Sequence, residues 1–279
     1  MKLDILYINL QSATGRNDEL VRNFSESAFT DEWTLHRFEA ISAQSQLVLD
    51  TKGTASPNLK GNYHSHVECI RQSKCYDNHV MIIEDDTKFC HATQFWLERI
   101  IESISENDWD IILIDFYVSN AIDMADLMKA RRQCLESNSI SLTNAALWNR
   151  AFAGAGSYIV NKNSKNKIIE AMSFDSLDYA YDLLLRQAMC GGVLNGILVF
   201  PFLTTVSDIG DDSQVQGQDR LLEVIYMHLF RRLTWIGADD LQAIKERADQ
   251  LRPKNFPEDV ALLESIMMPL LSLQMHWRT

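Results

Sequence analysis

Three adjacent carboxylates, Glu84, Asp85 and Asp86, end an apolar run of strand character, Val80–Ile83. Like charges packed side by side raise one another's pKa, and a bound cation reverses that cost. Hard oxygen donors favour Mg²⁺ or Mn²⁺, and a pair of carboxylates leaves coordination positions open for substrate phosphates. Open α/β sheets also bind ligands at the carboxyl ends of their strands. The residues therefore predict a metal site, with a solvated acidic turn as the alternative.

The elements that must position these acids follow an alternating pattern. Strand-like and helix-like segments alternate in the first half, as in a mixed or parallel sheet covered by helices. Expected strands are 3–10, 33–40, 80–83, 109–116, 152–160 and 193–202, and expected helices are 17–27, 63–76, 92–106 and 162–172. We expect a loop over 42–60, a mobile lid or acceptor-side insertion over 119–149, and helices from about 218 to the end. This predicts a domain over 1–217 and a helical extension over 218–279.

Composition excludes several classes of protein. The 279 residues carry a net charge of −12 and no Lys/Arg-rich run, which argues against a nucleic-acid partner. Leu3–Leu10 is typical of a strand rather than a signal peptide, and no apolar run reaches the roughly 18 residues of a membrane span. Five cysteines without a C-x-x-C pair suit reduced, mostly buried thiols. We expect a cytoplasmic protein, which could lie against the inner membrane face.

Five separated motifs occur in order within residues 3 to 210. They are Ile8-Asn9-Leu10 with Arg16, Phe38-Glu39-Ala40, Gly61-Asn62-Tyr63-His64-Ser65-His66, Ile82-Ile83-Glu84-Asp85-Asp86 and Gly154-Ala155-Gly156-Ser157-Tyr158-Ile159-Val160. The set resembles the pattern of glycosyltransferase family 25, which includes lipooligosaccharide and collagen galactosyltransferases. The resemblance implies a GT-A-like, Rossmann-like α/β fold with a mixed sheet flanked by helices. It also implies a UDP-sugar donor, with galactose as the first choice, and transfer with inversion.

The resemblance also implies roles for individual residues. The acidic cluster would hold Mn²⁺ or Mg²⁺ through Glu84 and Asp86. Apart from the resemblance, the polar segment 206–213 could close over the diphosphate and supply Asp208 as a further ligand, or it could be a plain surface loop. Five residues would contact the donor: Asn9, Arg16, His66, Asp85 and Gly156. The acceptor would be a glycan or a lipid-linked glycan, as in lipopolysaccharide biosynthesis.

Inverting transfer needs a carboxylate that deprotonates the acceptor hydroxyl. We expect Asp182 to be this base, with Asp178 and Asp175 as rivals on the same short polar segment. All three could instead be surface carboxylates at a helix end. The family's Pro-x-Asp segment is present here as Ala180-Tyr181-Asp182.

Three alternatives stay open. The family's Gly-Cys-x-x-Ser-His is altered over residues 61–66, which favours a non-catalytic relative that binds nucleotide sugars or carbohydrate. A metal-dependent phosphohydrolase would need further His or Asp ligands. In the C-terminal segment, apolar residues over 221–235 predict burial against the catalytic domain or in a homo-oligomer. Arg220, Arg231 and Arg232 favour peripheral membrane contact instead.

Overall fold

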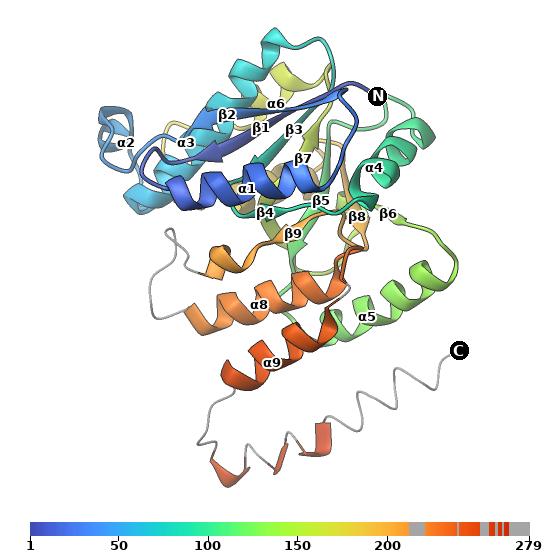
Figure 1. Ribbon diagram of the computed structural model, residues 1–279. Helices are drawn as coiled ribbons and strands as arrows, with labels where there is room; N and C mark the ends of the chain where they lie inside the picture. The colour runs from blue at the N-terminus through green and yellow to red at the C-terminus, as the bar shows by residue number, and fades with distance from the viewer. Residues whose placement is uncertain (212–220, 239, 252–256, 260–261, 264, 268–279) are drawn as a thin grey trace.

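A mixed β-sheet forms the centre of the protein, as the computed structural model shows (Figure 1). The structure describes all residues except 212–220, 239, 252–256, 260–261, 264 and 268–279. Within the described residues the sheet has seven strands, in the order β2-β1-β3-β7-β5-β8-β6. Their bounds are β1 (Leu3–Asn9), β2 (Trp33–Glu39), β3 (Val80–Glu84), β5 (Ile111–Tyr117), β6 (Ser141–Asn144), β7 (Ala153–Val160) and β8 (Gly196–Phe200). β1 runs parallel to β2 and β3, whereas β7 is antiparallel to its neighbours β3 and β5.

Helices cover both faces of this sheet. They are α1 (Thr14–Glu26), α2 (Gln46–Asp50), α3 (Pro57–Gln72), α4 (Ala92–Ser103), α5 (Ala121–Glu136), α6 (Lys165–Ala171), α7 (Tyr181–Cys190), α8 (Leu221–Thr234) and α9 (Leu241–Leu251). Side chains of a strand alternate between faces, so Leu6 and Ile8 join the core under α3, α6 and α7, and Leu3 and Ile5 join the core under α1 and α4. The expected α/β class, with a mixed sheet flanked by helices and a helical C-terminal region, is confirmed.

The segment predicted as a loop over 42–60 contains helix. α2 lies within it, and α3 begins at Pro57 rather than near Tyr63. The Ser56 side chain accepts a hydrogen bond from the Leu59 backbone N–H, and proline is well suited to the first helical turn because it needs no N–H partner there. Capping chemistry therefore outweighs the loop-like composition of this segment. α7 also forms where the sequence analysis placed a short polar segment.

The region 119–149, expected to be a lid or an insertion, contributes a strand to the sheet. Its helix α5 is followed by β6, which pairs antiparallel with β8 through Ser141↔Phe200 to Asn144↔Ile197. β6 lies at the edge of the sheet, and its residues are mostly exposed. An edge strand without a buried face has no strong alternation of apolar residues, which is why the pattern did not reveal it.

The C-terminal helix α8 packs on the rest of the chain. Its neighbours include β9 (Thr205–Val206), which pairs antiparallel with β4 (Thr87–Lys88), and α9, which lies beside it (Figure 1). Buried residues from this region are Val224, Ile225, Leu229, Phe230 and Trp235. The predicted burial is confirmed for these side chains, whereas Arg220 and the side chains of Leu221 and Leu222 lie outside the described part. The division at residue 217 stays a prediction.

The cysteines and the lack of a membrane-spanning segment were also predicted from the sequence. Among the cysteines, Cys69 and Cys134 are buried, Cys90 is half-buried, and Cys75 and Cys190 are exposed, so the prediction of mostly buried thiols was wrong. All five are free thiols, as expected. In the described part of the chain, no helix has the length and apolarity that a membrane crossing requires.

Candidate functional site

A cavity of about 460 Å³ lies at the edge of the sheet where β1 and β3 end. These strands are parallel, with Ile8 opposite Glu84, so the segments that follow them meet at the same edge. The side chains around this cavity include Arg16 from α1, Asn62 from α3, Glu84 and the two acids after it, Tyr117 from β5 and Asp182 from α7. Elements far apart in the sequence thus bring polar side chains together in one hollow.

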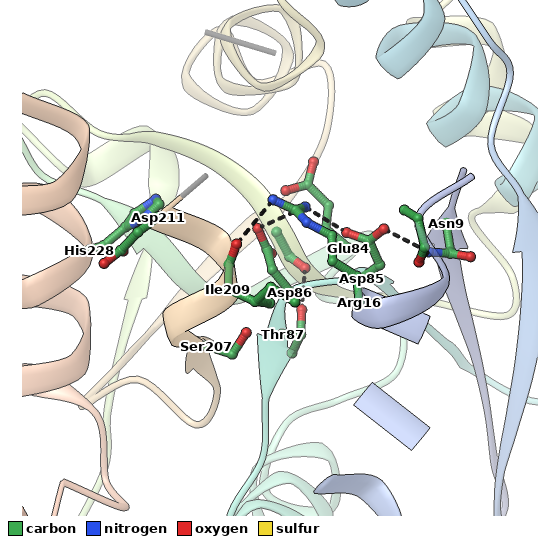
Figure 2. A network of polar contacts seen from close by, with 12 residues as sticks. Asn9, Arg16, Glu84, Asp85, Asp86, Thr87, Ser207, Ile209, Asp211 and His228 are labelled. Atoms are coloured by element: carbon green, nitrogen blue, oxygen red, sulfur yellow. Dashed lines mark hydrogen bonds and ion pairs between the residues drawn. The ribbon is translucent and has the colours of Figure 1, made fainter. Parts of the chain in front are cut away.

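Asp85 is the anchored member of the acidic cluster. Its Oδ2 accepts a hydrogen bond from Asn9 Nδ2 at 2.8 Å, and its Oδ1 accepts one from Arg16 Nη1 at 2.8 Å (Figure 2). Asn9 is itself held by Arg37, whose Nε donates to Asn9 Oδ1 at 3.0 Å. Burial opposes the charge of Arg16, but the carboxylates of Asp86, Asp85 and Glu84 raise its pKa. This network fixes Arg16 against the cluster.

Asp86 is the acid of the cluster whose charged form is least favoured. Burial and the neighbouring Glu84 raise its pKa to about 7, against the attraction of Arg16 and with a further contribution from Asp85. Arg16 Nη1 lies 3.5 Å from Asp86 Oδ2, a longer contact than the one to Asp85. Because burial and the neighbouring carboxylates disfavour the charged form of Asp86, a further cation beside it would stabilise that form.

Two residues of α3, Asn62 and His66, contact Glu84. Its Oε1 accepts a hydrogen bond from Asn62 Nδ2 at 3.0 Å and lies 3.5 Å from Nε2 of the fully buried His66. Although burial raises it, contacts with His66, Asn62 and Arg231 lower the pKa of Glu84 to about 2. The imidazole of His66 stacks on Tyr181 at a centroid distance of 4.3 Å, and its Nδ1 lies 3.0 Å from the Tyr158 hydroxyl. Glu84 is therefore a fixed carboxylate beside an Asp86 that keeps its proton more readily.

Arg231 of α8 lies next to the acidic cluster, since both Arg231 and Glu84 approach Gly156. It is buried and forms a two-pronged ion pair with the buried Asp115 of β5, one contact being Nε to Oδ1 at 2.8 Å. Its guanidinium also lies over the Tyr117 ring, 4.5 Å from the centroid. At Gly156, an added Cβ would lie 3.2 Å from Arg231 Nη2 and 3.8 Å from Glu84 Oε2. The glycine thus permits the close approach of the guanidinium to the strand.

A second buried ionic group joins α8 to η3 (Asp208–Asp211). Arg232 Nη2 donates to Asp211 Oδ1 and to the Ser207 carbonyl, at 2.8 and 2.7 Å. His228 Nδ1 lies 3.1 Å from Asp211 Oδ1, and its Nε2 lies 3.1 Å from the Tyr117 hydroxyl. Two of the three arginines considered for membrane contact, Arg231 and Arg232, are thus buried and paired, whereas Arg220 lies outside the described residues.

η3 closes one side of the cavity. The Ser207 backbone N–H donates to the Asp86 carbonyl at 2.7 Å, and Arg16 Nη2 donates to the Ile209 carbonyl at 3.5 Å (Figure 2). At Gly210, an added Cβ would lie 2.9 Å from Asp86 Oδ2. Residues 207–210 thus lie beside the acids, while closure of this segment over a diphosphate stays a prediction, and residues 212–213 lie outside the described residues.

Asp182 lies on another wall of the same cavity, in the first turn of α7. Its Oδ2 accepts a hydrogen bond from the Gly154 N–H at 3.0 Å, and its Oδ1 accepts one from the Leu183 N–H at 2.9 Å. Burial and the charge of Glu84 raise the pKa of Asp182 against these two hydrogen bonds. The rivals lie elsewhere: Asp178 accepts hydrogen bonds from Thr54, and Asp175 does not line the cavity.

The donor set fits a divalent cation held by two carboxylates. Glu84 and Asp86 line the cavity together, and Mg²⁺ commonly uses one or two carboxylates with substrate phosphates completing the shell. Asp208 is not brought to them, because its side chain is 92% exposed and pairs with Arg232 at 3.3 Å. Within the described residues, no group of three or more His, Cys, Asp or Glu side chains could hold a metal. The metal ligands therefore stay a prediction for Glu84 and Asp86.

The residues predicted to bind the donor fall into two groups. Arg16 and Asp85 line the cavity. Asn9, His66 and Gly156 lie outside that lining: Asn9 holds Asp85, His66 approaches Glu84, and Gly156 leaves room for Arg231. Their part in donor binding stays a prediction.

Residues of this site that the sequence pattern did not predict include Asn62, Arg231 and His228. The altered motif over 61–66 contained a signal for Asn62, because an amide there can donate to an acid. No local signal marked Arg231 and His228, because their partners on β5, Asp115 and Tyr117, lie more than 100 residues away in the chain.

Comparisons with known proteins identify no family. No protein-family model matches the sequence, and no curated protein matches it significantly. Solved structures resemble it weakly. A glycosyltransferase involved in glycosylation of the major capsid of PBCV-1 gives a TM-score of 0.32 at 9% identity, covering 61% of this chain. This chain spans 64% of that protein's length.

Two other structures match over more of their length. The inositol-1-phosphate CTP transferase from T. maritima gives a TM-score of 0.38 at 14% identity, covering 81% of this chain and 96% of that one. The galactosyltransferase LgtC, in complex with donor and acceptor sugar analogs, gives 0.37 at 10% identity, covering 92% and 98%. At these values the likeness assigns no activity to this chain.

Proposed function

We propose that this protein is a glycosyltransferase with a GT-A-like fold that transfers a sugar from a nucleoside diphosphate to an acceptor hydroxyl. One observation carries the proposal: Glu84 and Asp86 face the same cavity as Asp182, whose pKa is raised. A paired carboxylate site for a diphosphate-bound cation and a separate carboxylate able to accept a proton are the two groups that such a transfer needs.

Each residue has a distinct task in this reaction. Asp182 accepts the proton of the acceptor hydroxyl, whose oxygen forms a bond to the anomeric carbon of the donor. The bond from that carbon to the diphosphate oxygen breaks, and its electron pair leaves with the nucleoside diphosphate. Arg16 lines the cavity and places positive charge where the departing phosphates need it.

Mn²⁺ or Mg²⁺ would be held by Glu84 and Asp86. When bound, the metal supplies positive charge to the departing diphosphate. His66, Asn62 and Arg231 lower the pKa of Glu84, and the amide of Asn62 orients its carboxylate, so the protein presents a fixed, ionised group there.

Finer features of the proposal rest on the sequence resemblance. These are membership of family 25, a UDP-galactose donor, inversion at the anomeric carbon, and a glycan or lipid-linked acceptor. A cytoplasmic location is proposed from the strand-like Leu3–Leu10 and the cysteine pattern instead. A homo-oligomer and a membrane contact through residues other than Arg231 and Arg232 belong to the same proposal.

A thermal-shift screen of nucleotide sugars, with and without Mn²⁺, tests the proposal. We expect one UDP-sugar to raise Tm in the presence of Mn²⁺, because a ligand that binds the folded state stabilises it. Asp86→Ala should remove the Mn²⁺-dependent part of the shift and leave the fold intact. Asp208→Ala is the matched control, because Asp208 is exposed and lies outside the cavity lining.

The screen also separates the alternatives. A Tm shift without any sugar transfer or donor hydrolysis would favour the non-catalytic relative. Absence of any shift with every nucleotide sugar would contradict the proposal.

A further inference from the structure

Asp182 lies between two hollows. Besides the 460 Å³ cavity that holds the acidic cluster, it lines a second hollow of about 230 Å³. Tyr117 is likewise shared by both linings. The second hollow is otherwise lined by Ser119, Ala151, Phe152, Ala153, Leu183, Arg186 and Met227. We call it the Arg186 groove. A molecule in this groove would lie beside the proposed base, which also lines the cavity of the acidic cluster.

Arg186 is the charged side chain that distinguishes the groove. It follows Asp182 by four positions on α7, so the two lie on one face of the helix. They form no ion pair in the described structure, and the two oxygens of Asp182 accept hydrogen bonds from the Gly154 and Leu183 backbone N–H groups. The Arg186 guanidinium lies over Phe152, 5.6 Å from the ring centroid. No Asp or Glu of the described residues lies within ion-pairing distance of Arg186.

The lining of the groove is suited to a charged sugar. Phe152, Leu183 and Met227 supply apolar surface on which the C–H face of a sugar ring can pack. The half-buried guanidinium adds planar donors that match a carboxylate or a phosphate. The chain carries a net charge of −12, so an anionic group needs such a local cation to bind.

We propose that the Arg186 groove binds the acceptor and that Arg186 selects an acceptor sugar bearing a carboxylate or a phosphate. The proposal rests on the proposed glycosyltransferase function, since it takes Asp182 as the base. It goes further by naming the chemical class of the acceptor and the residue that determines it. Arg186 acts here in substrate specificity, through contact with the acceptor and not with the donor.

Three sugars that differ at carbon 6 serve as probes: glucose, glucuronate and glucose 6-phosphate. Their binding to the full-length protein, saturated with UDP and Mn²⁺, is measured by calorimetry, which needs no turnover. We expect at least one anionic sugar to bind more tightly than glucose. Arg186→Gln should weaken that sugar by about ten- to a hundredfold, the range for losing a hydrogen bond to a charged group, and leave glucose unchanged. Arg186→Lys should restore part of the preference.

Arg99→Gln is the matched control. Arg99 also lies over a phenylalanine, with its guanidinium 5.2 Å from the Phe95 centroid, but it lines neither hollow. We expect this variant to bind all three sugars like the wild type. The two anionic probes distinguish a carboxylate acceptor from a phosphate acceptor.

The outcomes separate this inference from the proposed function. Equal binding of all three sugars by the wild type, no measurable binding, or an anionic preference that survives Arg186→Gln would overturn the inference. A preference that depends on Arg186, in a protein that binds no nucleotide sugar, would support an anion-selective groove and refute the glycosyltransferase proposal. Donor-dependent Tm shifts that persist in Arg186→Gln would confirm that the donor site is separate.

Discussion

Replacing Arg231 by methionine tests whether the buried ion pair between Arg231 and Asp115 stabilises the fold. The side chains of Arg231 and Asp115 are 5% and 1% exposed and meet through two contacts. The pair therefore belongs with buried pairs, where loss of one partner costs about 3–5 kcal/mol, and not with surface pairs worth about 0–1 kcal/mol. Arg231→Met should lower the free energy of unfolding by about 3–5 kcal/mol, because it leaves Asp115 buried without its cation.

The pH dependence of this loss has a definite sign. Burial raises the pKa of Asp115 even with Arg231 beside it, and removal of Arg231 raises it further. In the variant, folded Asp115 then keeps a proton that the unfolded chain releases above about pH 3.9. Between the pKa of Asp115 in the unfolded chain and its higher pKa in the folded variant, lowering the pH therefore favours the folded state. The deficit should be smaller at pH 5.5 than at pH 8.

Urea denaturation at both pH values measures this deficit. The double variant Arg231→Met with Asp115→Asn should recover part of the loss, because no buried charge is left unpaired. Arg150→Met is the control: Arg150 is 29% exposed, pairs with Asp123 and Asp126, and should lose at most about 1 kcal/mol. A loss below 1 kcal/mol for Arg231→Met, or a deficit that grows as the pH falls, would refute the reasoning.

Three other predictions concern the base, a glycine and the C-terminal segment. Asp182→Asn should keep donor binding and lower turnover by about 10²- to 10⁴-fold, the range for losing a general base; a kcat near that of the wild type would transfer the role to another acid. Gly154→Ala should destabilise the protein by about 1–3 kcal/mol, because φ is +112° and the new Cβ would lie 2.8 Å from Tyr117 Cδ2. Its control is Gly15→Ala, where no atom lies within 4 Å of the added Cβ, and equal stability of the two variants in urea would contradict the argument. Removal of residues 219–279 should cause aggregation in gel filtration and light scattering, because it uncovers core around Phe230 and leaves Asp115 and Asp211 without Arg231 and Arg232; a soluble, stable, monomeric product would disprove it.

Much of the sheet could be predicted from the sequence because its strands are buried on both faces. Continuous apolar runs such as Val80–Ile83 and Ile111–Ile114 have few alternatives to a central strand, and both are fully or almost fully buried. The edge strand β6 and the helix α7 escaped prediction for the opposite reason. β6 lacks a buried face, and α7 buries Leu184, Leu185 and Met189 on one side of a segment whose acids resembled a loop.

The sequence by itself determined the acidic cluster, since Glu84-Asp85-Asp86 is contiguous and directly ends a strand. It also led to Asp182 as the expected base and, through the resemblance to family 25, to Arg16 as a donor contact, and both roles stay predictions. Only the tertiary structure decided which acids form a close ion pair with an arginine. Asp85 is paired with Arg16, Asp115 with Arg231 and Asp211 with Arg232, whereas Asp86 keeps a pKa of about 7. Charge compensation depends on distances of a few ångströms between residues that are 21 to 116 positions apart in the chain, and local patterns of residues contain no record of those distances.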